Sequence, residues 1–433
     1  MPAFLPIDPF LKNRRAYRLT NLAIGGAVAA ALACAALAEP AAAPGDPAAA
    51  LDARLASGQA HLEYRTGSGY LSSLLERLHI PVDSQVLVFS KTSLQVEHIS
   101  PKTPRAIYFN DNVAVGAAQG GRIFEILAYD PKEGLAFYTL DTTKAAAPRL
   151  QRDGPECLSC HGQLNPWAPG MIVANVVPEA DGTPLPITTG KLFDITDTRT
   201  PYDQRWGGWY VTGTHGTMHH NGNVTLKPDA DGLDPHAGLN VTDLSGRLDL
   251  SKYLASSSDI TALMTLEHQV GATNLIGQII AQMKSLEEGA PAGGQRATQA
   301  DVDASIEILV RYLVYADEPA LPSPVKGISQ FADTFSAQGP RDAKGRGLHD
   351  LDLKTRLARY PLSWMIYSDA FASLDPKAKA KVYQRLFDIL SGADRSAAFA
   401  KISAADKRAA LEIAAATKLD LPAYWRGAAR ASP

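Results

Sequence analysis

The chain has 433 residues, of which 45% are hydrophobic and 20% are charged, and its formal net charge at pH 7 is -3. This length accommodates two or three cooperating core regions, and the composition is typical of a globular protein rather than a disordered or fibrous one. A net charge this small gives no reason to expect nucleic acid or an anionic membrane surface as the partner. We therefore predict that no nucleic acid is bound.

Residues 1–38 have the features of an export signal. A basic stretch precedes an apolar run from about Leu22 to Leu37, and the run ends in small residues suited to cleavage. The run is shorter than the roughly 20 residues that span a bilayer, so no transmembrane anchor is expected after cleavage. We predict a periplasmic protein, with lipid attachment through Cys34 as the less favoured alternative.

The pattern of elements predicts an α+β fold. Apolar spacing over 71–78 indicates a short helix that ends before Pro81, and β-rich runs separated by Pro, Gly and Asp follow from Val86 to Leu140. The segment "IFEILAYDPKEGLAFYTL" is the clearest hairpin. The predicted layout is a signal peptide (1–38), an Ala/Pro-rich tether (39–60), a mainly β region (61–150), a loop-rich region with a C-x-x-C-H motif (151–255) and a helical region (256–433).

The C-x-x-C-H motif is Cys157, Cys160 and His161 within "GPECLSCHGQLNPW". Once the signal is removed these are the remaining cysteines, so no other thiol is left for a structural disulfide. Two cysteines at this spacing can add to the two vinyl groups of a haem as thioethers, and the following histidine can coordinate the iron from the proximal side. The motif therefore predicts one covalently attached haem c.

Three other chemistries use the same residues. A structural zinc site needs a fourth ligand, and no second motif of the usual spacing is present. A thioredoxin-like dithiol needs its cysteines at a helix N-terminus in a βαβ context, whereas Pro and Gly surround this motif. A plain disulfide is the third. Export favours haem, because covalent haem attachment takes place outside the cytoplasm.

Candidates for the other face of the iron lie further along the chain. Met171 follows His161 by ten residues in an apolar run, where a core role is the simpler interpretation. The run "WGGWYVTGTHGTMHHNGN" combines histidines with glycines that allow close approach to a flat cofactor and tryptophans that could line it. Within this run His215 and His220 are candidate distal ligands or pocket residues, with solvated loop histidines as the alternative.

The helix that starts near Ser258 supplies the last candidates. His268 lies on it as a possible sixth iron ligand or proton donor, and Glu267 as a possible acid or base. With Gly271, Asn274 and Gln278, Glu267 forms a polar stripe on an otherwise apolar helix. The alternative is a helix face that is exposed or satisfied by neighbouring loops.

The chain resembles exported bacterial proteins described as cytochrome c domain-containing, over nearly the whole mature length. In similar proteins "GTHG" is followed by "RH" where this chain has His219 and His220, which favours His215 and His220 over His219. A histidine is expected before Asn274, and its absence here weakens any role of a second histidine on that helix. The resemblance implies a single exported haem c protein without an assigned activity. It rests on segments that include "YFNDNVAVG", "GLAFYTLD", "CLSCHG", "RWGGWYVTGTHG", "HNGN", "VTDLSGRLDLSKYL", "SDITALMTLEHQ", "GPRDAKGRGLHDLDLKTRL" and "RYPLSWMIYSDAF".

Two functions compete for such a protein. The mature chain is several times larger than a minimal electron-carrying cytochrome of roughly 100 residues, which favours a haem-dependent oxidoreductase acting on a small molecule such as peroxide, a nitrogen oxide or an organic substrate. The alternative is an electron-transfer cytochrome with two strong axial ligands that docks a redox partner protein. A zinc-binding structural protein is the second alternative.

Overall fold

The computed structural model describes residues 45–162, 166–186, 193–228, 230, 232–289 and 296–430. The predicted signal peptide, Cys34 and the first residues of the predicted tether lie outside this part of the chain. Within the described part, no helix combines the length and apolar character that crossing a membrane requires.

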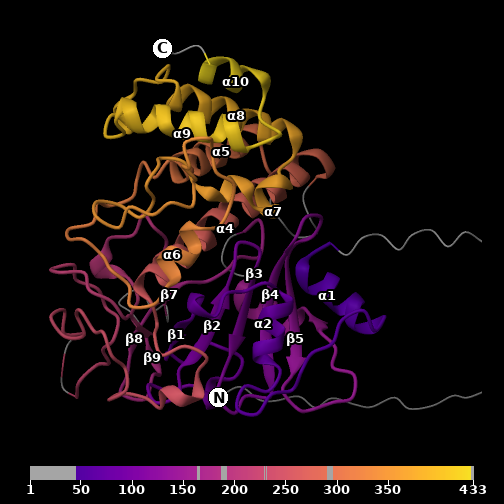
Figure 1. The fold of residues 1–433 in the computed structure, drawn as a ribbon, viewed down its shortest axis with the longest axis vertical. Coiled ribbons are helices and arrows are strands. Elements are labelled where there is room, and N and C mark those ends of the chain that lie inside the picture. Colours follow the sequence, from indigo (N-terminus) through magenta and orange to yellow (C-terminus); the bar gives the residue numbers. More distant parts are fainter. Residues whose placement is uncertain are drawn as a thin grey trace, which may run out of the picture. The chain divides into compact units, whose positions relative to one another are not determined.

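A seven-stranded antiparallel sheet occupies the N-terminal half of the described chain (Figure 1). Its strands run in the order β11-β1-β2-β3-β4-β5-β6. The predicted hairpin is confirmed, because β4 and β5 pair along their whole length from Ile123↔Asp141 to Asp130↔Gly134, and Gly134 adopts a positive φ of 83° at the turn. The strands are β1 (Val86–Val88), β2 (Arg105–Phe109), β3 (Val113–Ala117), β4 (Ile123–Asp130), β5 (Gly134–Asp141), β6 (Gln151–Asp153) and β11 (Trp209–Tyr210).

The two faces of this sheet differ in burial. Side chains alternate along each strand, so the register places Tyr108, Val115, Ile126 and Tyr138 on one face, and all four are buried. This face forms a core with helices α1 (Pro47–Ala56) and α2 (Leu71–Arg77). The opposite face carries apolar side chains that stay half-buried: Ile107, Ala114, Leu127 and Leu135.

Helix α1 corrects the prediction of a tether over 39–60. Asp46 caps the helix by accepting hydrogen bonds from the amides of Ala48 and Ala49, and its second carboxylate oxygen accepts one from the Tyr138 hydroxyl at 2.6 Å. Ala48 and Leu51 are buried in the sheet core. The cap and two small apolar contacts fold a segment whose Ala/Pro composition resembles a linker.

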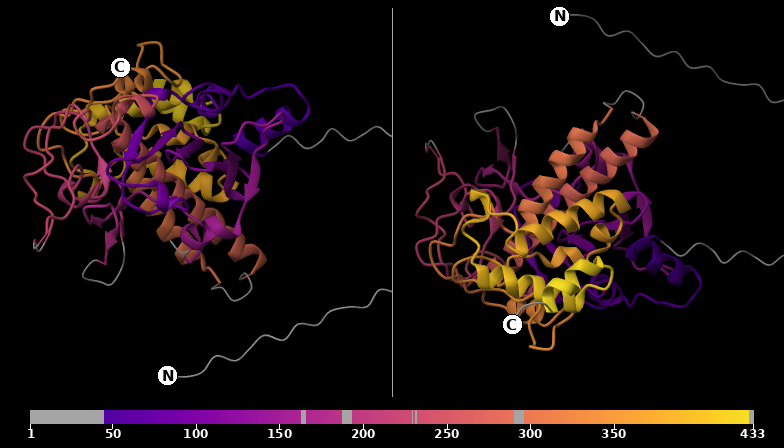
Figure 2. Two further views of the ribbon diagram at one scale, coloured as in Figure 1. Left: turned by 90° about the horizontal axis from the view of Figure 1, so that it is seen from below. Right: turned by 90° about the horizontal axis from the view of Figure 1, so that it is seen from above.

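The C-terminal region is helical, as predicted, and the mixed fold class is confirmed. In Figures 1 and 2, α8 and α9 lie side by side, as do α4 and α5. The helices are α4 (Ile260–Glu288), α5 (Gln299–Leu313), α6 (Phe331–Ser336), α7 (Asp369–Ala372), α8 (Pro376–Leu390), α9 (Ala404–Thr417) and α10 (Ala423–Arg430). Between the sheet and α4, the chain forms α3 (Pro155–His161), β7 (Ala174–Asn175), β8 (Val177–Pro178), β9 (Pro184–Leu185) and β10 (Asp194–Ile195).

Helix α4 joins the two halves. Its residue Leu266 belongs to the same hydrophobic cluster as Phe109 and Tyr129 of the sheet. This sheet face is therefore covered by α4 around Phe109 and Tyr129. Ile107, Ala114, Leu127 and Leu135 on the same face stay half-buried. This arrangement positions the site described next.

Candidate functional site

The C-x-x-C-H motif lies on a short helix rather than in a loop. Helix α3 starts directly after β6, with Pro155 in its first turn, where a missing backbone N–H costs nothing. Cys157 and Cys160 are one turn apart on this helix and are both free thiols, Cys157 half-buried and Cys160 exposed. Both sulfur atoms are thus available to one ligand lying against the helix.

His161 ends the helix in a defined orientation. Its ring contacts that of Phe137 on β5, with centroids 5.0 Å apart, and its Nδ1 lies 2.7 Å from the carbonyl oxygen of Gly170. A carbonyl only accepts, so Nδ1 carries the proton and Nε2 presents its lone pair. Burial lowers the pKa of His161, which keeps the imidazole neutral. A neutral ring held through Nδ1 is the usual state of a metal-binding histidine.

The surroundings of Cys157 do not activate it as a thiolate. Burial, together with the nearby carboxylates of Asp153 and Glu125, raises the pKa of Cys157 to about 11. Catalytic redox dithiols depend on the opposite shift. This environment therefore argues against a thioredoxin-like pair, even though the cysteines lie on a helix as such a pair requires.

The sheet beside α3 offers an apolar surface. Ile107, Ala114 and Leu127 are half-buried side chains on the face that carries Phe137, the ring that supports His161. At one end of this surface Arg105 pairs with Glu125 at 2.5 Å. Two thiols, one oriented imidazole and a partly open apolar surface fit a covalently attached haem, which is flat, largely apolar and exposed at its edge.

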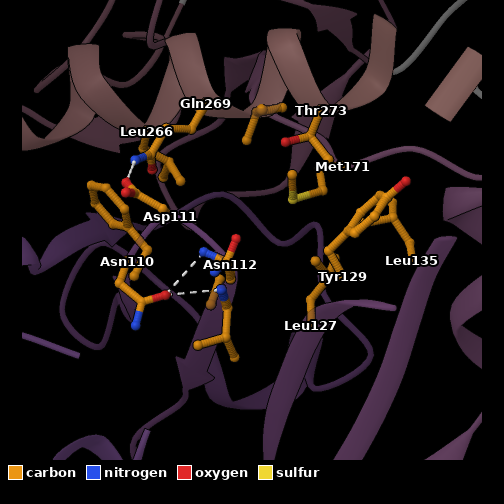
Figure 3. Close-up of a pocket in the computed structure, with 14 residues that line it drawn as sticks. Asn110, Asp111, Asn112, Leu127, Tyr129, Leu135, Met171, Leu266, Gln269 and Thr273 are labelled. Carbon is orange, nitrogen blue, oxygen red and sulfur yellow. Dashed lines mark hydrogen bonds between the residues drawn. The ribbon is translucent and has the colours of Figure 1, made fainter. Parts of the chain in front are cut away.

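A small cavity lies between this sheet face and α4 (Figure 3). Its volume is about 30 Å³, which accommodates about two or three water-sized groups. It is lined by the end of β2, the β2–β3 turn, β3, β4, β5, Met171 and the first half of α4: Phe109, Asn110, Asp111, Asn112, Val113, Ala114, Leu127, Tyr129, Leu135, Met171, Leu266, Gln269, Val270 and Thr273.

Met171 connects this cavity to His161. It lines the cavity directly after Gly170, the residue that holds the imidazole. The amide of Asn274 on α4 fixes it at both backbone groups, accepting from the Met171 N–H at 2.8 Å and donating to the Met171 carbonyl at 2.9 Å. Gly170 and Met171 form a short backbone segment that we call the strap behind His161. Asn274, predicted as part of a polar stripe, therefore joins this strap to the helical region.

His215 and His220 hold each other. The Nδ1 of His220 accepts from the Gly222 amide, so its Nε2 carries the proton and donates to Nε2 of His215 at 3.2 Å. Both are 1% exposed, and burial lowers the pKa of each, that of His220 to about 3. Among the described residues, no hydrogen bond or ring contact joins either of them to His161. The two histidines therefore bind each other and nearby backbone groups, which stabilises the loop that carries them.

The carboxylate of Glu267 forms a buried ion pair with Arg205. Its carboxylate accepts from Arg205 at 2.9 Å and from the Thr196 hydroxyl at 2.7 Å, and both charged side chains are at most 1% exposed. Burial raises the pKa of Glu267, while Arg205 opposes the shift. The predicted acid or base is thus held in place by Arg205, away from the residues that line the cavity.

His268 faces away from the cavity. At 100° per residue it points opposite Leu266 and Val270, and its ring stacks on Tyr312 and Tyr315 while Nε2 lies 2.7 Å from the Ser363 hydroxyl. The structure therefore does not bring His268 together with His161. The remaining stripe residues are also internal, since Gly271 abuts the Tyr312 hydroxyl and Gln278 donates to Ser305.

Sequence reasoning missed the polar end of the cavity. Asp111 and Gln269 meet there, and His349 approaches Asp111 from the far part of the chain. The one available signal was the run Asn110–Asn112, three polar residues between two strands, which reads as an ordinary turn.

The described residues contain no group of three or more His, Cys, Asp or Glu side chains placed to hold a metal ion. A haem iron does not require such a group, because the porphyrin supplies four of its ligands. Comparisons with protein-family models, curated proteins and solved structures find no match to this chain.

Proposed function

We propose that this chain is a mono-haem c protein in which Cys157 and Cys160 carry the haem as thioethers and His161 binds the iron. The observation that carries the proposal is the state of His161: its Nδ1–H donates to Gly170, its pKa is lowered, and Nε2 is left for a metal on the same helix as the two thiols. When bound, the haem supplies one-electron redox chemistry at the iron.

We further propose that this redox chemistry acts on a small molecule. The cavity supports this proposal, because Met171 and Leu135 line it. Gly170, directly before Met171, and Phe137, two residues after Leu135 on β5, both contact His161. The protein's own part would be to hold the His161 imidazole neutral and oriented, to place the half-buried sheet face beside the haem, and to offer a small cavity nearby.

An electron-transfer role is the second candidate, supported by the exposure of α3. Cys160 is exposed and Leu158 keeps 41% of its surface in solvent, so a haem edge at this helix could reach a redox partner protein. The optical spectrum distinguishes the two roles. Binding of carbon monoxide or cyanide supports the oxidoreductase, and an inert low-spin haem supports the carrier.

The haem itself is tested by retention through denaturing electrophoresis. The full chain is expressed with a cytochrome c maturation system, and haem-dependent peroxidase staining is measured on the gel for each variant. We expect a stained band for the wild type and for Cys34→Ser, and none for the double variant Cys157→Ser/Cys160→Ser. His161→Ala should alter the optical spectrum of whatever haem is retained. An unstained wild-type band from material that matures a known cytochrome would overturn the proposal.

A further inference from the structure

The cavity between the sheet and α4 has a polar end built around one carboxylate. Asp111 lies in the β2–β3 turn with 28% of its side chain exposed, and Figure 3 shows its carboxylate beside the Gln269 side chain at one end of the cavity. The side-chain amide of Gln269 donates to Asp111 at 2.6 Å. This hydrogen bond fixes one oxygen of the carboxylate and leaves lone pairs on both for a further donor.

His349 approaches the same carboxylate from behind. Its Nε2 lies 3.4 Å from the second oxygen of Asp111, and the ring, 2% exposed, packs against Phe335 and parallel to Tyr367. The Nδ1 of His349 has no hydrogen-bond partner among the described residues. The proton therefore belongs on Nε2, where it faces the carboxylate. Gln269 and His349 are positioning residues for Asp111.

The charge of the lining limits what the cavity accepts. None of the described residues that line it is Lys, Arg or His, and Asp111 is the acidic one. An anion entering this space meets a carboxylate without a cation to compensate, which is unfavourable in a partly enclosed site. A molecule that donates hydrogen bonds meets acceptors on Asp111 and on the neighbouring side-chain amides.

We propose that this cavity binds a small uncharged or cationic molecule that carries N–H or O–H donors, such as hydroxylamine, and that Asp111 is the residue that accepts its hydrogen bond. The volume limits the ligand to about two or three non-hydrogen atoms. The inference rests on the proposed haem function, because the molecule in the cavity would be the substrate of the haem. It excludes anions such as nitrite as substrates at this cavity.

Binding is measured without turnover, by saturation-transfer difference NMR on the full chain. Methylammonium serves as the donating probe and formate as an anion of similar size, with hydroxylamine added as a competitor. We expect the wild type to bind methylammonium, to release it on addition of hydroxylamine and not to bind formate. Asp111→Asn should weaken methylammonium binding at least tenfold, whereas Asp243→Asn, an exposed loop carboxylate, should leave it unchanged.

The role of Gln269 in positioning Asp111 is tested by a separate variant. Gln269→Leu should weaken methylammonium binding severalfold while still excluding formate, because the negative charge of Asp111 remains. Unchanged methylammonium binding in Asp111→Asn, or formate binding by the wild type, would overturn the assignment. Asp111-dependent binding by a chain that retains no haem would instead leave the cavity assignment standing and remove the proposed haem function.

Discussion

His268 lies in an aromatic cage that keeps its imidazole uncharged. Tyr312, Tyr315 and Trp364 surround the ring, and its Nδ1 has no hydrogen-bond partner among the described residues. Burial lowers the pKa of His268 to about 3. Such a histidine contributes to packing when neutral. It lowers the free energy of unfolding when the solution becomes acidic, because the buried ring cannot take up a proton without cost.

The pKa of His268 predicts an acid-dependent loss of stability that His268→Phe removes. The unfolded chain takes up a proton near pH 6.5 and the folded chain does not, so this group costs wild-type stability as pH falls below that value, by about 2 kcal/mol at pH 5. We expect the difference in unfolding free energy between variant and wild type to shift by this amount in favour of the variant between pH 7 and pH 5. Urea denaturation at both pH values measures it.

The same variant tests the role that the sequence predicted for His268. Its placement opposite Leu266 on α4 leads us to expect unchanged haem absorption bands in His268→Phe. A shifted band would show that His268 acts on the iron and would contradict the structural role assigned here.

At the residue scale, sequence reasoning works for residues that are neighbours in the chain. Cys157, Cys160 and His161 form one contiguous motif, so haem attachment could be predicted from their spacing, and it stays a prediction. Asp111 and His349 are 238 residues apart, so their approach depends on how the sheet and the helical region pack. For His268, a pattern of polar residues cannot reveal whether the surrounding pocket is aromatic or solvated.

At the element scale, periodic segments were predicted and weakly patterned ones were not. The β4–β5 hairpin and helices α4, α5, α8 and α9 carry apolar periodicity over eight or more residues. Helix α1 buries little beyond Ala48 and Leu51, and β11 is two residues long. The pairing of β11 with β1 joins residues more than 100 positions apart, which no local pattern indicates.

Helix α1 also gives a prediction, because Asp46 both caps it and binds the sheet. Asp46→Ala removes two cap hydrogen bonds and leaves the Tyr138 hydroxyl without its acceptor, so we expect a loss of about 2–3 kcal/mol in unfolding free energy. Asp249→Ala, which removes an exposed cap of the short 3-10 helix Leu250–Lys252, should cost less than about 1 kcal/mol. Equal effects in urea denaturation would contradict a stabilising role for α1 and favour a flexible tether over 39–60.

At the scale of the whole molecule, Pro44–Pro433 forms one compact unit. The sequence suggested a β region, a loop-rich region and a helical region, with junctions where composition changes, and left open whether the β and helical regions are separate domains. In the structure, one hydrophobic cluster extends from Phe109 and Tyr129 of the sheet into α4, α5 and α8. Composition marks changes of secondary structure, whereas a domain boundary requires that few contacts cross it.

This continuity predicts that the sheet and the helical region unfold together. Differential scanning calorimetry of the chain should show a single transition for this unit. Asn274→Leu removes both hydrogen bonds that tie Met171 to α4, leaves two backbone groups of a half-buried residue unpaired, and should lower the transition by about 2–4 °C without splitting it. Gln384→Leu, which removes an exposed amide contact with Asp388, should leave the transition in place. Two separate transitions would contradict a single cooperative unit, and with it the idea that the helices stabilise the strap behind His161.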